Sequence, residues 1–134
     1  MNRRFPTLFL LFLLVATACG PSEQSAGTAA VEVRLLSDPD PIIVGEAKLS
    51  IVVSDMAWKP LNGADVSVSL IAPDQEEAGR TRESRGVGAG RYEVIGAQFG
   101  SEGRWTVRIR VDVAGGTWIE TDRTLDVEAV APGD

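Results

Sequence analysis

Strict alternation of apolar and polar residues runs through most of the chain. The longest example covers residues 104–113, in which Trp105 and every second residue after it are apolar and the residues between them are polar. A period of two that persists over such a length predicts a β-strand with one buried face. Shorter alternating segments predict further strands at residues 31–35, 48–54, 65–70, 91–94 and 117–127.

Turn-forming residues separate these segments at regular intervals. Asn62-Gly63 and Gly115-Gly116 supply the positive φ angles that tight turns need. A weak strand fits near residues 82–85, and the two prolines in residues 38–41 exclude a helix because proline lacks an amide donor. We therefore expect one all-β domain, a single immunoglobulin-like antiparallel β-sandwich of about seven strands.

One tyrosine bears on the class of sandwich. The segment 90–94, Gly-Arg-Tyr-Glu-Val, resembles a tyrosine corner, in which a tyrosine hydroxyl bonds to backbone a few residues upstream. Val94 stands where such domains often carry a cysteine. The alternative interpretation is that Tyr92 is an ordinary residue of an alternating strand, and the sequence leaves both open.

The first 18 residues have the pattern of a secretory signal peptide. Arg3 and Arg4 are basic, residues 8–15 are apolar, and small residues follow them. The apolar run is shorter than the roughly 20 residues that a membrane-spanning helix requires. We expect residues 1–18 to be removed after export.

The end of this segment, Ala16-Thr17-Ala18-Cys19, resembles the lipobox of bacterial lipoproteins, in which the cysteine becomes the lipidated first residue of the mature chain. The alternative is an ordinary signal peptide followed by an incidental cysteine. The resemblance implies that lipid such as palmitate on Cys19 holds the protein on a membrane of the cell envelope, facing the periplasm or the exterior. Because Gly20 rather than aspartate follows, the outer membrane is favoured if the bacterium is Gram-negative.

The mature chain divides into three parts. Residues 19–30 comprise the lipidated cysteine and a linker rich in glycine, serine and alanine, a composition typical of a flexible tether. Residues 31–128 carry the alternating pattern of the sandwich, and residues 129–134 form a short tail.

Charge and composition exclude several functions. Removing Arg3 and Arg4 from the 13 basic residues leaves 11 against 19 acidic ones, a formal charge of −8, which argues against binding to nucleic acid. The chain has no histidine, and its one cysteine is Cys19, so the usual general bases, activated nucleophiles and zinc ligands are missing. We expect no enzyme activity, no catalytic residue, no cofactor and no metal-binding residue.

Two acidic groups are candidate calcium ligands. Asp38 and Asp40 flank Pro39, and Asp74 lies close to Glu76 and Glu77. Carboxylate oxygens are suitable ligands for Ca²⁺, but neither group fits a calcium loop. Solvated loop charges are the favoured interpretation.

Arginines form a basic stripe on the polar face of the longest predicted strand. Arg104, Arg108 and Arg110 share this face. The stripe is either an anion or partner site or one half of a set of cross-strand ion pairs. If the turn lies at residues 114–116, Arg110 falls opposite Glu120 and Arg108 opposite Asp122, so pairing is favoured.

The sulfur and indole groups near residue 56 have two interpretations. Met56 beside Trp58 offers a soft ligand for Cu(I), but one thioether without histidine is a poor ligand set. Packing of both side chains over the end of the sandwich is favoured. Trp105 is expected in the core, and Trp118, if exposed, marks a contact surface.

Residues 45–127 resemble the YtkA-like or FixH-like domains of bacterial envelope proteins. The resemblance rests on the loop at 59–66, on the Gly-x-Tyr segment at 90–94 and on the Gly-x-Trp segment at 99–107. It implies a compact β-sandwich tethered to the envelope, and some relatives are linked to copper supply or respiratory oxidase assembly. Copper-handling relatives tend to have methionine and histidine in the stretch that corresponds to residues 69–88, which here contains neither.

Two functions follow from these patterns. The first is a membrane-anchored, non-catalytic envelope lipoprotein that binds another envelope protein as an accessory module. The alternative is a copper-handling or respiratory-oxidase assembly accessory protein.

Overall fold

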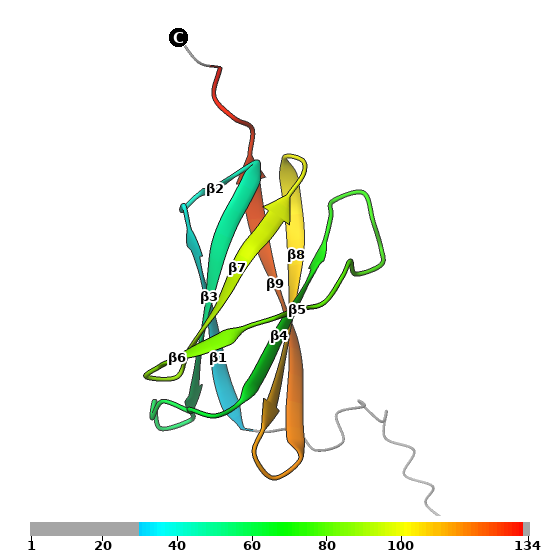
Figure 1. Cartoon of the computed structure of the whole chain (residues 1–134). Helices are drawn as coiled ribbons and strands as arrows, with labels where there is room; N and C mark the ends of the chain where they lie inside the picture. The colour runs from blue at the N-terminus through cyan, green and yellow to red at the C-terminus, as the bar shows by residue number, and fades with distance from the viewer. Residues whose placement is uncertain (1–29, 133–134) are drawn as a thin grey trace, which may run out of the picture.

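The computed structural model describes residues 30–132, which form two β-sheets packed face to face (Figure 1). Sheet A has the strand order β1-β3-β7-β6, and sheet B has the order β2-β9-β8-β4-β5. The expected all-β sandwich is confirmed. The strands are β1 (Val31–Asp38), β2 (Ile42–Ile43), β3 (Gly45–Asp55), β4 (Asp65–Ile71), β5 (Arg82–Glu83), β6 (Arg85–Gly88), β7 (Arg91–Phe99), β8 (Gly103–Val113) and β9 (Thr117–Glu128).

The double-proline segment makes the sandwich differ from the expected antiparallel arrangement. After β1 the chain bends at Pro39–Pro41, leaves the edge of sheet A and continues in the same direction as β2 on the edge of sheet B. There Ile42 lies opposite Val127 in a parallel pair with β9. The expected antiparallel sandwich therefore includes one short parallel pair at this edge, because the chain changes sheet without reversing direction.

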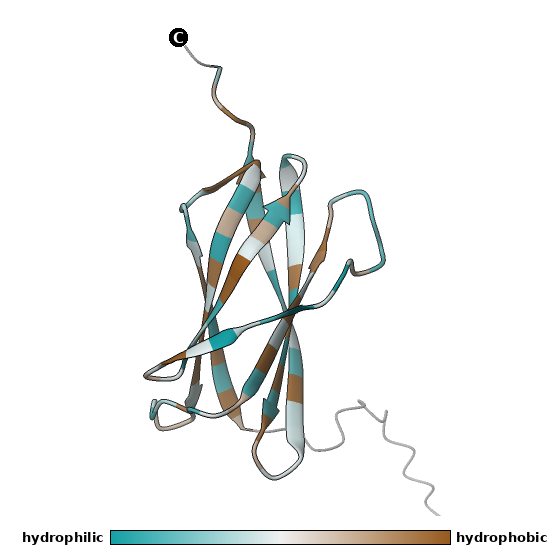
Figure 2. Ribbon diagram, in the orientation of Figure 1, coloured by the Kyte–Doolittle hydropathy of each residue, from teal (hydrophilic) through white to brown (hydrophobic). Residues whose placement is uncertain are grey.

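The core lies between the sheets and consists of the apolar half of each alternating strand (Figure 2). Ile51 of β3 faces it from sheet A, and Ile109 of β8 faces it from sheet B, both with no exposed surface. Trp105 is 7% exposed, as expected for a core residue, and packs edge-to-face on Phe99 with 5.1 Å between ring centroids. Its indole N–H donates to the carbonyl of Ser101 at 2.9 Å, so the one polar atom of the ring is satisfied.

The tyrosine hydroxyl bonds to backbone upstream, but its sequence separation from that partner is larger than in a tyrosine corner. Buried Tyr92 donates to the carbonyl oxygen of Leu61 at 2.8 Å and accepts the N–H of Ala64 at 2.9 Å. Leu61 lies 31 residues upstream, in the loop between β3 and β4, rather than a few residues away. The hydroxyl therefore fastens this loop over the end of the core.

The chain enters and leaves the sandwich at opposite ends (Figure 1). Val31 lies opposite Asp55, the last residue of β3, so the first strand begins beside the β3–β4 loop. We call this the N-terminal end of the sandwich, and it comprises the loops and turns at residues 56–64, 86–90 and 114–116. The C-terminal segment departs from the other end, after Glu128.

Candidate functional site

The outer face of sheet B carries the polar half of the alternating pattern. The register places side chains of β4, β8 and β9 in rows across this face. We call it the sheet B face. Its three central rows are Asp65–Asp112–Trp118, Ser67–Arg110–Glu120 and Ser69–Arg108–Asp122.

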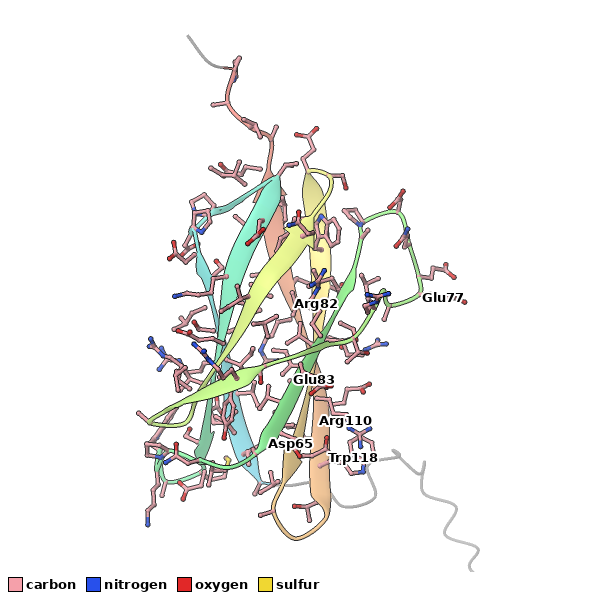
Figure 3. The ribbon with its side chains drawn as sticks, viewed as in Figure 1. Asp65, Glu77, Arg82, Glu83, Arg110 and Trp118 are labelled. Carbon is pink, nitrogen blue, oxygen red and sulfur yellow. The ribbon has the colours of Figure 1, made fainter. Side chains whose placement is uncertain are left out.

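Arg110 lies at the centre of the sheet B face and contacts two neighbouring side chains. Its Nε and Nη2 atoms donate to the two carboxylate oxygens of Asp112 at 3.0 and 3.1 Å. Its Cζ atom lies 4.4 Å from the centroid of the Trp118 ring, which is the geometry of a cation–π contact. Figure 3 shows Arg110 and Trp118 together, with Asp65 and Glu83 nearby.

The pairing of Arg110 partly corrects the sequence-based prediction. The predicted register is correct, because Arg110 lies opposite Glu120. The guanidinium nevertheless bonds to Asp112 on its own strand, since stacking on Trp118 turns it toward that row. The hydrogen bond from Arg110 lowers the pKa of Asp112 below its ordinary value, and the same bond raises the pKa of Arg110.

The neighbouring arginine pairs as predicted. Arg108 lies opposite Asp122 and donates to both of its carboxylate oxygens, at 3.0 and 3.1 Å. Glu120 lies 3.6 Å from the same guanidinium. The hydrogen bond to Asp122 raises the pKa of Arg108. The third arginine, Arg104, has an exposed contact with Asp126 at 3.4 Å.

The structure places Trp118, whose role the sequence leaves open, and Trp58, which is expected to pack over the end of the sandwich. Trp118 is half-buried under Arg110 on the sheet B face. Trp58 is 69% exposed and Met56 is 67% exposed, so the expectation that both pack over the end of the sandwich is wrong. The Asp55 carboxylate explains this outcome, because its Oδ1 atom accepts the N–H groups of Ala57 at 2.8 Å and Lys59 at 2.9 Å and closes a turn that directs these side chains outward.

The candidate metal ligands do not assemble into a site. Within residues 30–132, no group of three or more histidine, cysteine, aspartate or glutamate side chains is arranged to hold a metal ion. Asp38 is the last residue of β1 and Asp40 lies in the bend that follows it, whereas Glu77 lies on the separate loop before β5 (Figure 3). Met56 is the one thioether among these residues, which is fewer soft ligands than a copper site requires. The lipidation site Cys19 lies outside the described residues.

A small hollow beside the core was not anticipated from the sequence. It has a volume of about 190 Å³ and is lined by Trp105, Arg80 and Arg82 among others. Small-molecule sites usually have volumes of roughly 300–1,000 Å³. The hollow is therefore smaller than a typical ligand pocket. A second hollow of about 390 Å³ is lined by residues 75–79 of one exposed loop alone, so the sheet B face is the stronger candidate site.

Comparison with known proteins places the chain in a family. The model of the family described as YtkA-like matches residues 25–110, which is more than half of the sequence. The chain belongs to the YtkA-like family. No curated protein matches its sequence. In the described part of this YtkA-like protein, no helix is long and apolar enough to cross a membrane.

Solved structures share the fold of this YtkA-like domain. CopC from Methylosinus trichosporium OB3b superposes with a TM-score of 0.50 at 12% identity, covering 77% of this chain and 100% of CopC. The Lin-41 filamin domain superposes with a TM-score of 0.52 at 19% identity, covering 77% of this chain and 98% of that domain. The PmoD soluble domain from Methylocystis sp. ATCC 49242 (Rockwell) gives 0.47 at 10% identity, covering 72% of this chain and 90% of that domain. At 12% and 19% identity, the likeness to CopC and to the filamin domain concerns the fold alone.

Proposed function

We propose that this YtkA-like protein is a lipid-anchored, non-catalytic binding module of the bacterial envelope, and that its sheet B face docks another envelope protein. The observation that carries the proposal is the stack of Arg110 on Trp118 at the centre of that face. Tryptophan and arginine are enriched among the residues that dominate binding energy in protein interfaces. A guanidinium that is already stacked and hydrogen-bonded loses little conformational freedom when a partner covers it.

The charges around this stack indicate the chemistry of the partner. Carboxylates outnumber guanidinium groups on the sheet B face and on β5 beside it. Arg108 and Arg110 are each hydrogen-bonded to an aspartate, and Glu120 shares the Arg108 guanidinium at 3.6 Å. Two further carboxylates beside them, Asp65 and Glu83, form an acidic rim. An acidic rim favours a partner surface that carries lysine or arginine and steers its approach at low ionic strength.

The anchor supplies the location. Lipid on Cys19 holds the module on the membrane, with the outer membrane favoured in a Gram-negative host, and residues 20–30 let it reach a neighbouring envelope protein. Confinement to one surface raises the effective concentration of the two partners, so a modest docking face is sufficient.

Photo-crosslinking in intact cells tests the docking face. A photoreactive phenylalanine replaces Thr124, which is exposed on the sheet B face, in the full-length lipoprotein. We expect one dominant crosslinked product that disappears in Trp118→Ala and weakens as salt is raised. The matched control places the same probe at Ile95, which is 63% exposed on sheet A.

Two results contradict the docking proposal. Equal products from the Ile95 and Thr124 probes mean that crosslinking reports proximity alone. A Thr124 product that survives both Trp118→Ala and Arg110→Ala means that the stack does not bind the partner. Leu36→Ala serves as the control for loss of an exposed apolar side chain, because Leu36 is 40% exposed on β1 of sheet A, outside the sheet B face.

The alternative function is a copper-handling or respiratory-oxidase assembly accessory protein, as the resemblance to YtkA-like domains implies. The observation in its favour is that the Asp55 turn holds the Met56 thioether in solvent, where a partner can reach it. Calorimetric titration of the domain with Cu(I) and Cu(II) tests it. Tight one-to-one binding that is lost in Met56→Leu supports copper handling, and binding unchanged in Met56→Leu excludes Met56 as the ligand.

A further inference from the structure

Exposed apolar side chains gather at the N-terminal end of the sandwich. Met56 and Trp58 project from the β3–β4 loop, and Val87, which is 45% exposed, lies on β6 just before the turn into β7. The loop and the turn touch, because the N–H of Gly90 donates to the side-chain oxygen of Asn62 at 2.8 Å. These three side chains, which we call the apolar tip, thus belong to one end of the molecule (Figure 1).

The turn that carries the apolar tip is firmly held in an outward conformation. Besides the two bonds to the Asp55 carboxylate, the N–H of Trp58 donates to the Asp55 carbonyl at 3.0 Å and the N–H of Asp55 to the Lys59 carbonyl at 2.9 Å. Trp58 has a φ of 65°, a left-handed conformation that a bulky residue seldom adopts. Such an outlier at an exposed tryptophan motivates a search for a functional contact.

The charges of the two ends differ. The segments 56–64, 86–90 and 114–116 at the N-terminal end contain no aspartate or glutamate, and their one charged residue is Lys59. The bend and turn at the opposite end carry Asp40 and Glu102. Asp55 borders the first of these segments, and its carboxylate is hydrogen-bonded to N–H groups of the turn. In a mature chain with a formal charge of −8, the projecting segments of the N-terminal end are thus suited to approach an anionic lipid surface.

The start of the described chain places this end toward the anchor. Val31 pairs with Asp55, immediately before the turn that carries Met56 and Trp58. Eleven residues lie between Cys19 and Val31, and the twelve Cα–Cα steps that connect the two span at most roughly 40 Å when fully extended. The tether therefore attaches beside the apolar tip and keeps it within reach of the membrane.

We propose that the apolar tip inserts into the interfacial layer of the membrane to which Cys19 is anchored. This inference rests on the lipid anchor of the proposed function. Tryptophan prefers the headgroup region, where its ring is partly apolar and its N–H stays hydrated, and Met56 and Val87 add apolar surface beside it. Insertion fixes the strands steeply relative to the membrane, so that the sheet B face points sideways toward neighbouring envelope proteins.

Fluorescence quenching by brominated lipids tests the insertion. The full lipidated protein is reconstituted in vesicles of phosphatidylethanolamine and phosphatidylglycerol with bromine on the acyl chains. We expect quenching of tryptophan emission that is lost in Trp58→Asn and kept in Trp118→Phe. Asparagine tolerates positive φ, so Trp58→Asn should fold, and circular dichroism checks that it does.

The outcomes distinguish failure of the tip insertion from failure of the lipid anchor. Incorporation of labelled palmitate that is lost in Cys19→Ser establishes the anchor independently of fluorescence. With the anchor established, equal quenching in Trp58→Asn and the parent overturns the insertion. Protection of Trp58 in membrane-free buffer that increases with protein concentration also overturns it, in favour of a second copy as the occupant. Absence of palmitate incorporation overturns the anchor and this inference together.

Discussion

At the scale of single residues, Tyr92 and Gly90 together fix the β3–β4 loop. The Tyr92 hydroxyl bonds to Leu61 and Ala64, while the Gly90 backbone approaches β3 so closely that its carbonyl accepts the N–H of Val53 at 2.8 Å. Tyr92 acts through its hydroxyl, whereas Gly90 can come this close to β3 because it has no side chain. Both residues hold the β3–β4 loop in place, so the contribution of each can be measured as a change in the stability of the domain.

Tyr92→Phe removes the hydroxyl and leaves the Leu61 carbonyl and the Ala64 N–H without that partner. Loss of a partner for part-buried polar groups costs about 1–3 kcal/mol. We expect the free energy of unfolding in urea to fall by roughly this amount. Ile95→Val, at an exposed site on the same strand, should change it by less than about 0.5 kcal/mol. Equal losses of stability in Tyr92→Phe and Ile95→Val would contradict the role of the Tyr92 hydroxyl in holding the β3–β4 loop.

Gly90→Ala places a Cβ atom against the backbone oxygen of Val53, at a φ of 69°. Gly63→Ala is the matched control, since Gly63 has a φ of 78° and open space where the added Cβ atom would lie. The control should lose about 1–2 kcal/mol, the cost of a left-handed residue with a side chain. Gly90→Ala adds a backbone clash, and we expect it to be substantially less stable than Gly63→Ala by thermal unfolding.

At the scale of elements, the hairpin of β8 and β9 shows how far the sequence predicts the site. Alternation and the Gly-Gly turn were sufficient to predict the register and the pair of Arg108 with Asp122. They did not predict the contact of Arg110 with Asp112, because residues two apart on one strand share a face without being cross-strand partners. The stack on Trp118, a diagonal contact, decides between Asp112 and Glu120.

Acid tests the contact of Arg110 with Asp112. The pKa of Asp112 is lower in the folded chain than its ordinary value of 3.8, so the carboxylate stabilises the fold above that pH. This contribution is lost as the pH falls through the folded-state pKa. Asp112→Asn should therefore have a slightly lower Tm than the parent at neutral pH, and the difference should vanish below that pKa. Calorimetry across this range measures it, and a constant difference contradicts the assignment.

The inward face of β9 contains a polar link between the sheets. Arg123 donates through Nη2 to the Val33 carbonyl of β1 at 3.1 Å and through Nη1 to the Thr121 hydroxyl at 2.7 Å. Arg123→Leu should cost about 1–2 kcal/mol and accelerate hydrogen exchange of the β1 amides. Arg104→Leu is the control, because its exposed ion pair contributes less than about 1 kcal/mol. Unchanged hydrogen exchange of the β1 amides in Arg123→Leu would contradict a stabilising role of Arg123 between the sheets.

At the scale of the whole molecule, the sequence predicts the layers better than the ends. Period-two alternation identifies buried strand faces, so the two-sheet core was foreseen. The parallel pairing of β2 depends on the direction of the chain after Pro41, which periodicity does not encode. The exposure of Trp58 depends on the Asp55 carboxylate and a positive φ, whereas hydrophobicity alone favoured burial.

The position of Val31 at one extremity of β1 determines how the domain bears mechanical load. A pull from the tether acts nearly along the axis of β1, whose eight residues pair with β3 from Val31↔Asp55 to Asp38↔Lys48. Force in this direction shears all of these pairs at once, whereas force across the strand peels them one after another. Under the proposed anchoring at Cys19, a partner that pulls on the sheet B face loads β1 in this direction, and the β1–β3 pairs resist separation together.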